Sequence, residues 1–323
     1  MKKRISLFLA LMLLLTLSAC GKQEKPADPG SAAQTGSTTA PTAGTTEPTA
    51  PPITWMTFPA DRDMTAQQYF VYNCETGRFM AISGEEEDRI YPASVTKLFT
   101  AYVAGQYVSP DKKITVDEAM DYVYPGSSVA GLKRGDEITA RQLVEGMLLP
   151  SGNDAAYVLA IEAAGNLSDW DGMGAVEAFV AEMNSQARLL GMTGSHFANP
   201  DGIHEDDHYM TYRDLAILGM LSLEDPVIMT YAATASDTVT ISGEEKQWKN
   251  TNALIHPDSE YYCPHAIGLK TGQTPSAGSC LLSAFEYDGT TLIIGVFGCP
   301  EVEDRFADTL QLFNNAVDRL NKK

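Results

Sequence analysis

The stretch Tyr91-Pro-Ala-Ser-Val-Thr-Lys-Leu-Phe-Thr100 marks the point where the predicted secondary structure changes from strand to helix. From Ser94 onward the apolar side chains recur at helical spacing, so Ser94 is expected at a helix start. A serine oxygen placed there lies near unsatisfied backbone N–H groups and the positive end of the helix dipole. Lys97 follows on the same helix face, and Cβ atoms at this spacing are about 5–6 Å apart. The pair therefore predicts a nucleophilic serine with a lysine base, because burial or a second cation lowers the pKa of a lysine.

Strands are predicted toward both ends of the chain, and helical patterns fill the middle. In chain order, the expected elements are strands at 68–74 and 78–83, a helix from Ser94, helices at 140–149, 154–164, 176–190 and 212–221, strands at 238–241, 266–271, 279–287 and 291–297, and an amphipathic helix at 301–321. Asp288-Gly289 is a hairpin turn signal between two of these strands. Because strands and helices are segregated, we expect an α+β fold, with an antiparallel sheet of about five strands from both chain ends, flanking helices and a helical insert.

Two further short motifs lie within this pattern. Ser151-Gly152-Asn153 occupies a break between two predicted helices, where its hydroxyl and amide would face a cleft. Taken alone, the same residues predict a helix cap, with Asn153 or Ser151 capping the following helix. Lys270-Thr271-Gly272 ends a predicted strand and leads into Gln273. A lysine and a threonine together hold a carboxylate, and glycine permits close backbone approach.

The three motifs in this order resemble those of the penicillin-recognising serine hydrolases. The resemblance is specifically to the D-alanyl-D-alanine carboxypeptidases, the low-molecular-weight penicillin-binding proteins, and it runs from about Gln68 to Leu320. It implies the fold shared by β-lactamases and DD-peptidases. The surrounding residues that match are 91–100, 135–139, 148–156, 190–192, 197–202, 250–252 and 268–274.

The resemblance implies that the chain releases the terminal D-alanine of peptidoglycan stem pentapeptides. Ser94 would attack the carbonyl between the last two D-alanines, and Lys97 would take its proton. Ser151 would relay a proton toward the leaving amine, and Asn153 would orient Lys97 and the substrate amide. Water would then hydrolyse the acyl-enzyme without any cofactor. β-Lactam antibiotics would inhibit the protein by acylating Ser94.

The same resemblance implies how the substrate is bound. Lys270 and Thr271 would hold its terminal carboxylate, beside Gly272. The backbone N–H groups of Ser94 and Gln273 would form an oxyanion hole, in which losing one donor typically costs about 2.7–4 kcal/mol of barrier. Some family members have histidine where this chain has Gln273. That difference concerns efficiency and not reaction class, because the expected contact is through the backbone.

Three other functions share parts of this pattern. A class A β-lactamase also needs a glutamate in an E-x-x-L-N context after the second motif, and the chain has no such sequence. An endopeptidase that cuts peptidoglycan cross-links would use the same motifs, so it remains an alternative. A catalytically inactive wall-binding lipoprotein is the other alternative, although all three motifs are intact.

A zinc-peptidase signature also occurs, in His204-Glu205-Asp206-Asp207-His208. H-E-x-x-H binds zinc when a helix places both histidines on one face. Here a turn signal, Asn199-Pro-Asp-Gly202, precedes it, no apolar stripe supports a helix, and no third ligand is evident. We therefore expect a solvated acidic loop and no metal site.

The N-terminus has the pattern of an export signal. Lys2, Lys3 and Arg4 precede an apolar run from Ile5 to Leu17, which is shorter than the roughly 20 residues of a membrane span. The ending Leu17-Ser-Ala-Cys20 resembles a bacterial lipobox. Residues 1–20 are then a lipoprotein signal peptide, and acylated Cys20 holds the chain on the extracytoplasmic face of the cell membrane. An ordinary signal peptide with a chance cysteine is the alternative.

The rest of the chain divides into a linker and a catalytic domain. Residues 21–60 are rich in threonine, proline and alanine, so we expect a disordered tether. Residues 61–323 form the expected DD-carboxypeptidase catalytic domain. Members of the family often carry an additional C-terminal β domain and sometimes an anchor helix. This chain ends after the last predicted helix, so the lipid on Cys20 would take over anchoring.

Charge and cysteine content limit the partners and cross-links. The 323 residues carry a formal net charge of −19, which repels phosphate backbones and makes nucleic acid an unexpected partner. Cys74, Cys263, Cys280 and Cys299 show no metal-binding spacing, and export permits disulfides. Cys280 and Cys299 flank the predicted hairpin. Pairing across it and separate buried thiols both remain open.

Overall fold

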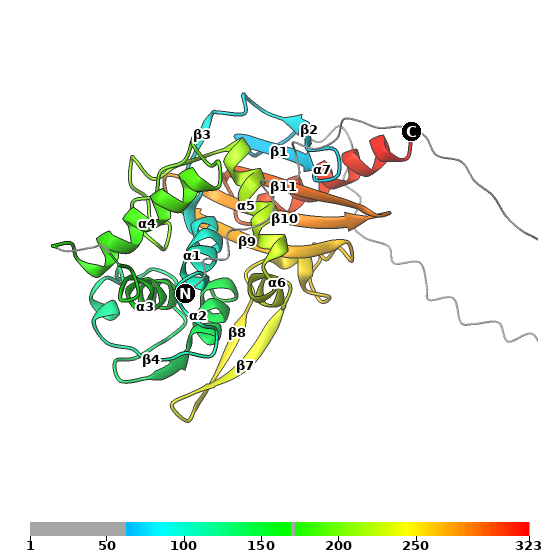
Figure 1. The fold of residues 1–323 in the computed structure, drawn as a ribbon. Helices are drawn as coiled ribbons and strands as arrows, with labels where there is room; N and C mark the ends of the chain where they lie inside the picture. The colour runs from blue at the N-terminus through cyan, green and yellow to red at the C-terminus, as the bar shows by residue number, and fades with distance from the viewer. Residues whose placement is uncertain (1–62, 169–171, 323) are drawn as a thin grey trace, which may run out of the picture. The chain divides into compact units, whose positions relative to one another are not determined.

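One antiparallel sheet joins the two ends of the described chain (Figure 1). The computed structural model describes residues 63–168 and 172–322. The strand order is β2-β1-β11-β10-β9, with β1 (Gln68–Asn73), β2 (Arg78–Ile82), β9 (Ala266–Thr274), β10 (Gly278–Tyr287) and β11 (Thr290–Cys299). Strand β1 pairs with β11, so early and late segments are neighbours. The predicted α+β fold, with its sheet from both chain ends, is confirmed.

The helical insert lies between β2 and β9, and one more helix follows β11. The helices are α1 (Thr96–Gly105), α2 (Ala140–Leu148), α3 (Asn153–Ala164), α4 (Ala175–Leu189), α5 (Tyr212–Glu224), α6 (Pro226–Ala232) and α7 (Asp304–Leu320), with 3₁₀ turns η2 (Ala93–Val95), η3 (Glu118–Asp121) and η4 (Ala253–Ile255). Three small antiparallel pairs are β3 (Arg89–Ile90) with β6 (Met210–Thr211), β4 (Lys113–Thr115) with β5 (Glu137–Thr139), and β7 (Ser236–Ile241) with β8 (Glu244–Lys249). Strands β3 to β6 were not predicted, because two or three residues show no periodicity. Strand β8 and helix α6 were also not predicted.

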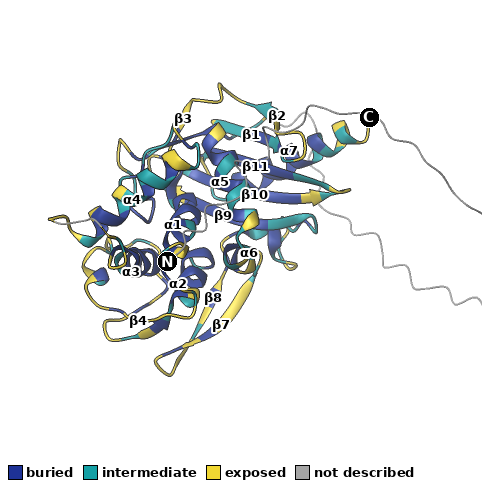
Figure 2. Cartoon of the chain, viewed as in Figure 1, coloured by how far each residue is buried: buried dark blue, intermediate teal, exposed yellow. Residues whose placement is uncertain are grey.

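The sheet separates two apolar cores. Alternate residues of a strand point to opposite faces, so neighbours in β10 enter different cores. Leu282 belongs to the core shared with the helical insert, and Leu281 to the core under α7, with Phe313. Figure 1 shows α5 and α7 on opposite faces of the sheet. Figure 2 shows β10 and β11 buried over most of their length, while the outer hairpin of β7 and β8 is largely exposed.

The four described cysteines carry free thiols. Across the hairpin, Cys299 pairs with Ser279, and the register shifts before Leu281. Cys280 is therefore not the cross-strand partner of Cys299. Of the two alternatives for these residues, separate buried thiols agree with the structure.

The predicted signal peptide, Cys20 and the linker at 21–60 lie outside the described residues and stay predictions. Within the described part, no single helix has the length and hydropathy of a membrane span. The bent pair of α5 and α6 meets that test only when the two are taken together. Several apolar residues of this pair, among them Leu215, Leu218 and Ile228, are buried in the core.

Candidate active site

The serine of the first motif lies in a tight turn that opens directly into α1. Ala93 has a left-handed backbone, with φ of +48°, and Ser94 follows it in η2. Lys97, in the first turn of α1, is completely buried. Its Nζ lies 2.8 Å from Ser94 Oγ, a distance suited to proton transfer. The predicted nucleophile and base are thus in contact.

The environment of Lys97 favours the neutral amine. Burial lowers the pKa of Lys97 to about 8, against the opposing attraction of Asp201 and Asp154. Lys270 is also completely buried, and burial together with the charges of Lys97 and Arg305 holds the pKa of Lys270 well below its ordinary range. A lysine whose pKa is lowered toward neutral pH has a neutral fraction there that can act as a general base.

A backbone carbonyl completes the contacts of this pair, and sequence reasoning missed it. Lys97 Nζ donates a hydrogen bond of 2.6 Å to the carbonyl oxygen of Asp201, which also lies 3.5 Å from Ser94 Oγ. The following Gly202 has φ of +83°, and a Cβ there would lie 2.0 Å from Ala93 O. The resemblance at 197–202 implied no role for this segment. Its asparagine, proline and glycine predict a tight turn, but they do not show that the carbonyl of Asp201 contacts Lys97.

The second motif forms the connection between α2 and α3. Ser151 has a left-handed backbone with φ of +64°, and Gly152 occupies the N-cap position of α3 without a side-chain hydrogen bond. The expectation that Asn153 or Ser151 caps this helix is therefore wrong, because Asn153 is already its first residue. Both side chains are buried, and Asn153 lines the cleft described below.

The third motif packs its glycine against the nucleophile turn. A Cβ on Gly272 would lie 3.0 Å from Ser94 N and 2.9 Å from Pro92 O, so only glycine allows this approach. Thr271 is hydrogen-bonded to the hydroxyl of Thr251, and Lys270 Nζ donates to the carbonyl of Thr271 at 3.0 Å. The strand β9 thus brings the motif to the serine.

Arg305 is a further buried cation that the sequence did not single out. It lies in the first turn of α7 and donates from Nη1 to the carbonyl oxygen of Gly272 at 3.1 Å. Its Nε has no hydrogen-bond partner among the described residues. Burial lowers the pKa of Arg305 from its ordinary value. An arginine in an amphipathic helix is usually solvated, so its residue type carried no signal.

The motifs meet at a cleft of about 590 Å³. Ser94, Asn153 and Gln273 line it directly, whereas Lys97 and Lys270 are buried and the backbone of Gly272 packs on the Ser94 turn. Other lining residues are Tyr124, Pro125, Gly126, Ser127, Ser128, Gly202, Ile203, His204, Thr274, Pro275, Gly278, Ser279 and Pro300. Cys20, the predicted lipid site, lies outside the described residues.

The residues of the zinc-peptidase signature do not form a helix. The segment 203–208 is a loop with a turn at 206–207, as expected, and its three acidic residues are exposed. His208 is buried, accepts at Nδ1 from Ala198 N, and therefore carries its proton on Nε2, which donates to Thr96 Oγ1 at 2.8 Å. Burial lowers the pKa of His208 to about 3, so the ring is neutral. His204 instead packs edge-on against Tyr91 at the cleft.

Comparison with known proteins gives consistent results. Residues 55–301 match the profile of the D-alanyl-D-alanine carboxypeptidase family. The D-alanyl-D-alanine carboxypeptidase of Streptomyces sp. (strain K15) is 34% identical over 88% of this chain and 97% of its own length. DacF of Bacillus subtilis and DacA of Escherichia coli, both D-alanyl-D-alanine carboxypeptidases, are each 30% identical over 76% and 79% of this chain. The chain spans only 60% and 61% of their lengths.

Solved structures show the same similarity. The Streptomyces K15 DD-transpeptidase superimposes with a TM-score of 0.70 at 32% identity, covering 78% of this chain and 97% of that one. Penicillin-binding protein D2 of Listeria monocytogenes, in a cefotaxime-bound form, gives a TM-score of 0.65 at 27% identity. That match covers 79% of this chain and 98% of the other.

Proposed function

Because the chain belongs to the D-alanyl-D-alanine carboxypeptidase family, as its three motifs predicted, we propose that it is a serine-type D-Ala-D-Ala carboxypeptidase. It removes the terminal D-alanine of peptidoglycan stem pentapeptides through an acyl-enzyme on Ser94, and penicillins inhibit it. The observation that carries this proposal is the 2.8 Å contact between Ser94 Oγ and the buried Lys97 Nζ beside a cleft.

Acylation begins with transfer of the Ser94 proton to Lys97. The neutral amine offers its lone pair to the hydroxyl, while its N–H remains on the Asp201 carbonyl. That carbonyl holds the amine in place through the step. Asn153 then contacts the substrate amide from α3, and Ser151 passes a proton to the leaving D-alanine. Water repeats the same attack on the acyl-enzyme.

Two buried basic side chains support binding of the terminal carboxylate. Lys270 and Arg305 form no ion pair with an acidic side chain in the part of the chain that the structure describes. A buried charge without a partner is unfavourable, so a carboxylate supplied by the substrate would stabilise Arg305 and would favour the charged form of Lys270. Thr271 and its hydrogen-bonded neighbour Thr251 add hydroxyl groups at the same strand.

Stabilisation of the oxyanion is assigned to two backbone groups. Ser94 N lies at the close approach between Gly272 and the nucleophile turn. Gln273 follows in the same strand and lines the cleft. Backbone N–H groups are fixed before the reaction, and each such donor lowers the barrier by about 2.7–4 kcal/mol.

The function is tested by measuring D-alanine release from a pentapeptide that ends in D-Ala-D-Ala. Release that penicillin abolishes would support the carboxypeptidase. Cleavage of a cross-linked dimer without release from the pentapeptide would instead identify the alternative endopeptidase. Neither activity, with no covalent labelling by penicillin, would indicate the inactive wall-binding lipoprotein. An added amine acceptor would show whether the acyl group is also transferred, as the name of the Streptomyces K15 structure indicates for that protein.

We expect kcat/KM for D-alanine release to rise with pH up to about 8 and to level off above it. Only the neutral Lys97 accepts the serine proton, so the rate falls about tenfold per pH unit below that value. A profile that stays flat between pH 6 and pH 8 would contradict this assignment.

The free energy of unfolding should also rise between about pH 8 and the ordinary lysine pKa of 10.5, because in that range the unfolded chain binds the Lys97 proton more readily than the folded chain.

We also propose that the chain is exported and anchored by lipid on Cys20 at the extracytoplasmic face of the membrane. The support is the basic start, the short apolar run and the Leu17-Ser-Ala-Cys20 ending. Incorporation of a labelled fatty acid into the parent, and not into Cys20→Ser, is the expected result. Equal labelling of both would contradict it.

A further inference from the structure

One side of the cleft is formed by an irregular loop between η3 and β5. We call residues 122–136 the wall loop. Its members that line the cleft are Tyr124, Pro125, Gly126, Ser127 and Ser128. Long loops without regular structure need specific contacts to keep one conformation. The contacts that hold this loop come from the residue that follows the second motif.

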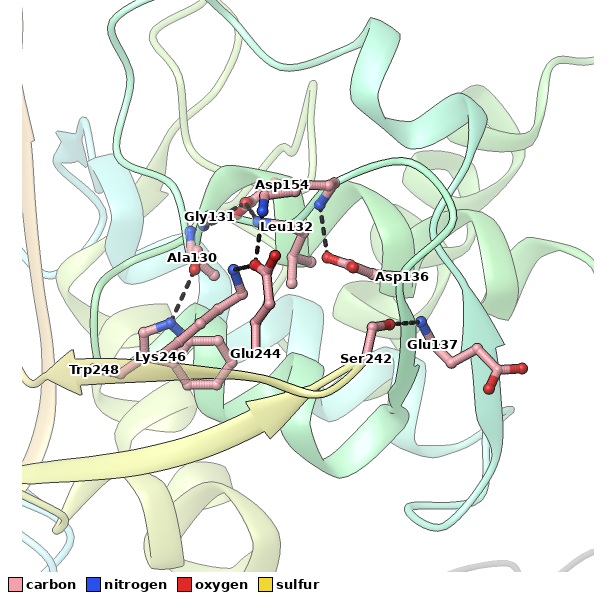
Figure 3. A network of polar contacts seen from close by, with 11 residues as sticks. Ala130, Gly131, Leu132, Asp136, Glu137, Asp154, Ser242, Glu244, Lys246 and Trp248 are labelled. Atoms are coloured by element: carbon pink, nitrogen blue, oxygen red, sulfur yellow. Dashed lines mark hydrogen bonds and ion pairs between the residues drawn. The ribbon is translucent and has the colours of Figure 1, made fainter.

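Asp154 binds the wall loop through its carboxylate (Figure 3). Oδ1 accepts from Ala130 N at 2.7 Å, and Oδ2 accepts from Gly131 N and Leu132 N, both at 2.9 Å. Oδ1 also accepts from Ala155 N at 2.9 Å. The side chain is completely buried and forms no ion pair within the described residues. Its charge is instead stabilised by backbone N–H groups and by the N-terminus of α3.

The same loop is held at neighbouring points. Asn153 N donates to Ser128 O at 2.8 Å, so the second motif and the cleft wall share a backbone hydrogen bond. Trp248 Nε1, from β8, donates to Ala130 O at 2.9 Å. A Cβ on Gly152 would lie 2.7 Å from Ala130 N, so glycine is needed there for the loop to approach. The loop and the motif therefore form one rigid unit.

We propose that Asp154 is a positioning residue for the substrate side of the cleft. Its carboxylate fixes the wall loop against the second motif and so sets the space between Tyr124–Ser128 and Gln273. It does not line the cleft, and it makes no hydrogen bond to Ser94 or Lys97. Asp154 therefore acts on substrate binding through the wall loop and reaches Lys97 only through its charge, which raises the pKa of that lysine. This inference rests on the proposed function.

Asparagine cannot replace this aspartate. The carboxylate receives N–H groups on both oxygens, whereas an amide has one acceptor oxygen and an NH₂ group. In Asp154→Asn, the NH₂ group would face either Ala130 N or the pair Gly131 N and Leu132 N. A donor facing a donor removes those bonds and leaves buried N–H groups unsatisfied. The wall loop then loses its attachment although the side-chain volume is kept.

The test compares Asp154→Asn with Asp136→Asn in the full-length protein. The side chain of Asp136 accepts a hydrogen bond from Lys133 N, in an exposed turn of the same loop. For Asp154→Asn we expect KM for the pentapeptide to rise about tenfold, with kcat changed by less than about threefold. Hydrogen exchange at 130–132 should accelerate. The pH midpoint of kcat/KM should move to lower pH and not to higher pH, because the charge of Asp154 raises the pKa of Lys97. Asp136→Asn should keep KM within about twofold of the parent.

A parental KM in folded Asp154→Asn would overturn the proposal. So would a loss carried mainly by kcat, because that would place Asp154 in proton transfer. If Asp154→Asn does not fold, Trp248→Phe decides the question, since it removes the donor to Ala130 O and keeps an aromatic ring, although the smaller ring also gives up packing beside Gly146. A KM rise of about threefold is then expected, and an unchanged KM overturns the inference.

Failure of the proposed function can be told apart from failure of this inference. If the parent is labelled by penicillin and releases no D-alanine, the carboxypeptidase assignment fails. The same variants are then compared by the penicillin concentration that gives half of the maximal labelling rate. That concentration should still rise about tenfold in Asp154→Asn, and an equal value in parent and variant would overturn the positioning role.

Discussion

Ser94→Ala is expected to abolish D-alanine release and covalent labelling by penicillin while the protein stays folded. The hydroxyl is the only group of this side chain that reacts, and Lys97 Nζ lies 2.8 Å from it. In a serine peptidase where the nucleophile was removed, kcat fell by about 2 × 10⁶. Lys97 keeps its hydrogen bond to the Asp201 carbonyl in the variant, so the buried amine stays satisfied. Mass spectrometry after incubation with penicillin measures the covalent labelling. Thermal unfolding shows whether the variant stays folded.

Ser127→Ala is the matched control for this experiment. Ser127 lines the same cleft, but its Oγ donates to the Tyr124 carbonyl at 2.7 Å and has no lysine in contact. Its loss should leave penicillin labelling complete. Labelling that survives in Ser94→Ala, or that disappears in Ser127→Ala, would assign the nucleophile to a different residue.

The sheet and the three motifs could be predicted because their signals are local. Short, mostly apolar runs and the Asp288-Gly289 turn mark β10 and β11, and the structure places these strands within one or two residues of the expected ranges. Ser94 and Lys97 meet because helix geometry alone brings their spacing onto one face. The resemblance to a known family then supplied the order of the motifs, which no periodicity contains.

The missed parts of the site depend on backbone direction and long-range packing. The Asp201 carbonyl points at Lys97 because the turn at Gly202 is left-handed, and residue types do not encode where a carbonyl points. Arg305 reaches Gly272 from α7, 33 residues further along the chain, with two strands in between. The cap of α3 was wrongly predicted for a related reason. Glycine is required at position 152 because a Cβ there would meet the backbone of Ala130, a contact that sequence spacing does not reveal.

Glycine at two positions sets the geometry of the nucleophile turn. Gly272 approaches it from β9 and Gly202 from the turn after Asp201, and both would place a Cβ against the backbone of residues 92–94. Ala93 has a left-handed backbone within this turn although it carries a side chain. A strained conformation of this kind persists only where its surroundings hold it. The close packing of the two glycines is what holds Ala93 and Ser94.

Gly202→Ala is therefore expected to lower kcat/KM for D-alanine release by at least about a hundredfold. Its Cβ would lie 2.0 Å from Ala93 O and 2.4 Å from Ala93 C, and backbone atoms cannot rotate aside as a side chain would. The turn must move, which separates Ser94 from Lys97 and from the oxyanion donors. Misplacement of reacting groups by about 1 Å can cost a factor of about 10² in rate. Steady-state kinetics and the rate of penicillin labelling measure this loss.

Gly191→Ala separates the steric effect from backbone strain. Gly191 has φ of +82°, almost the same as the +83° of Gly202, but no atom lies within 4 Å of its Cβ position. Both variants bear the left-handed strain of roughly 1–2 kcal/mol, measurable as a lower free energy of unfolding. Only Gly202→Ala should also lose activity, because only its Cβ meets the Ala93 carbonyl. If Gly191→Ala lost activity equally, strain alone would explain both results, and the packing of Gly202 would have no part in holding the nucleophile.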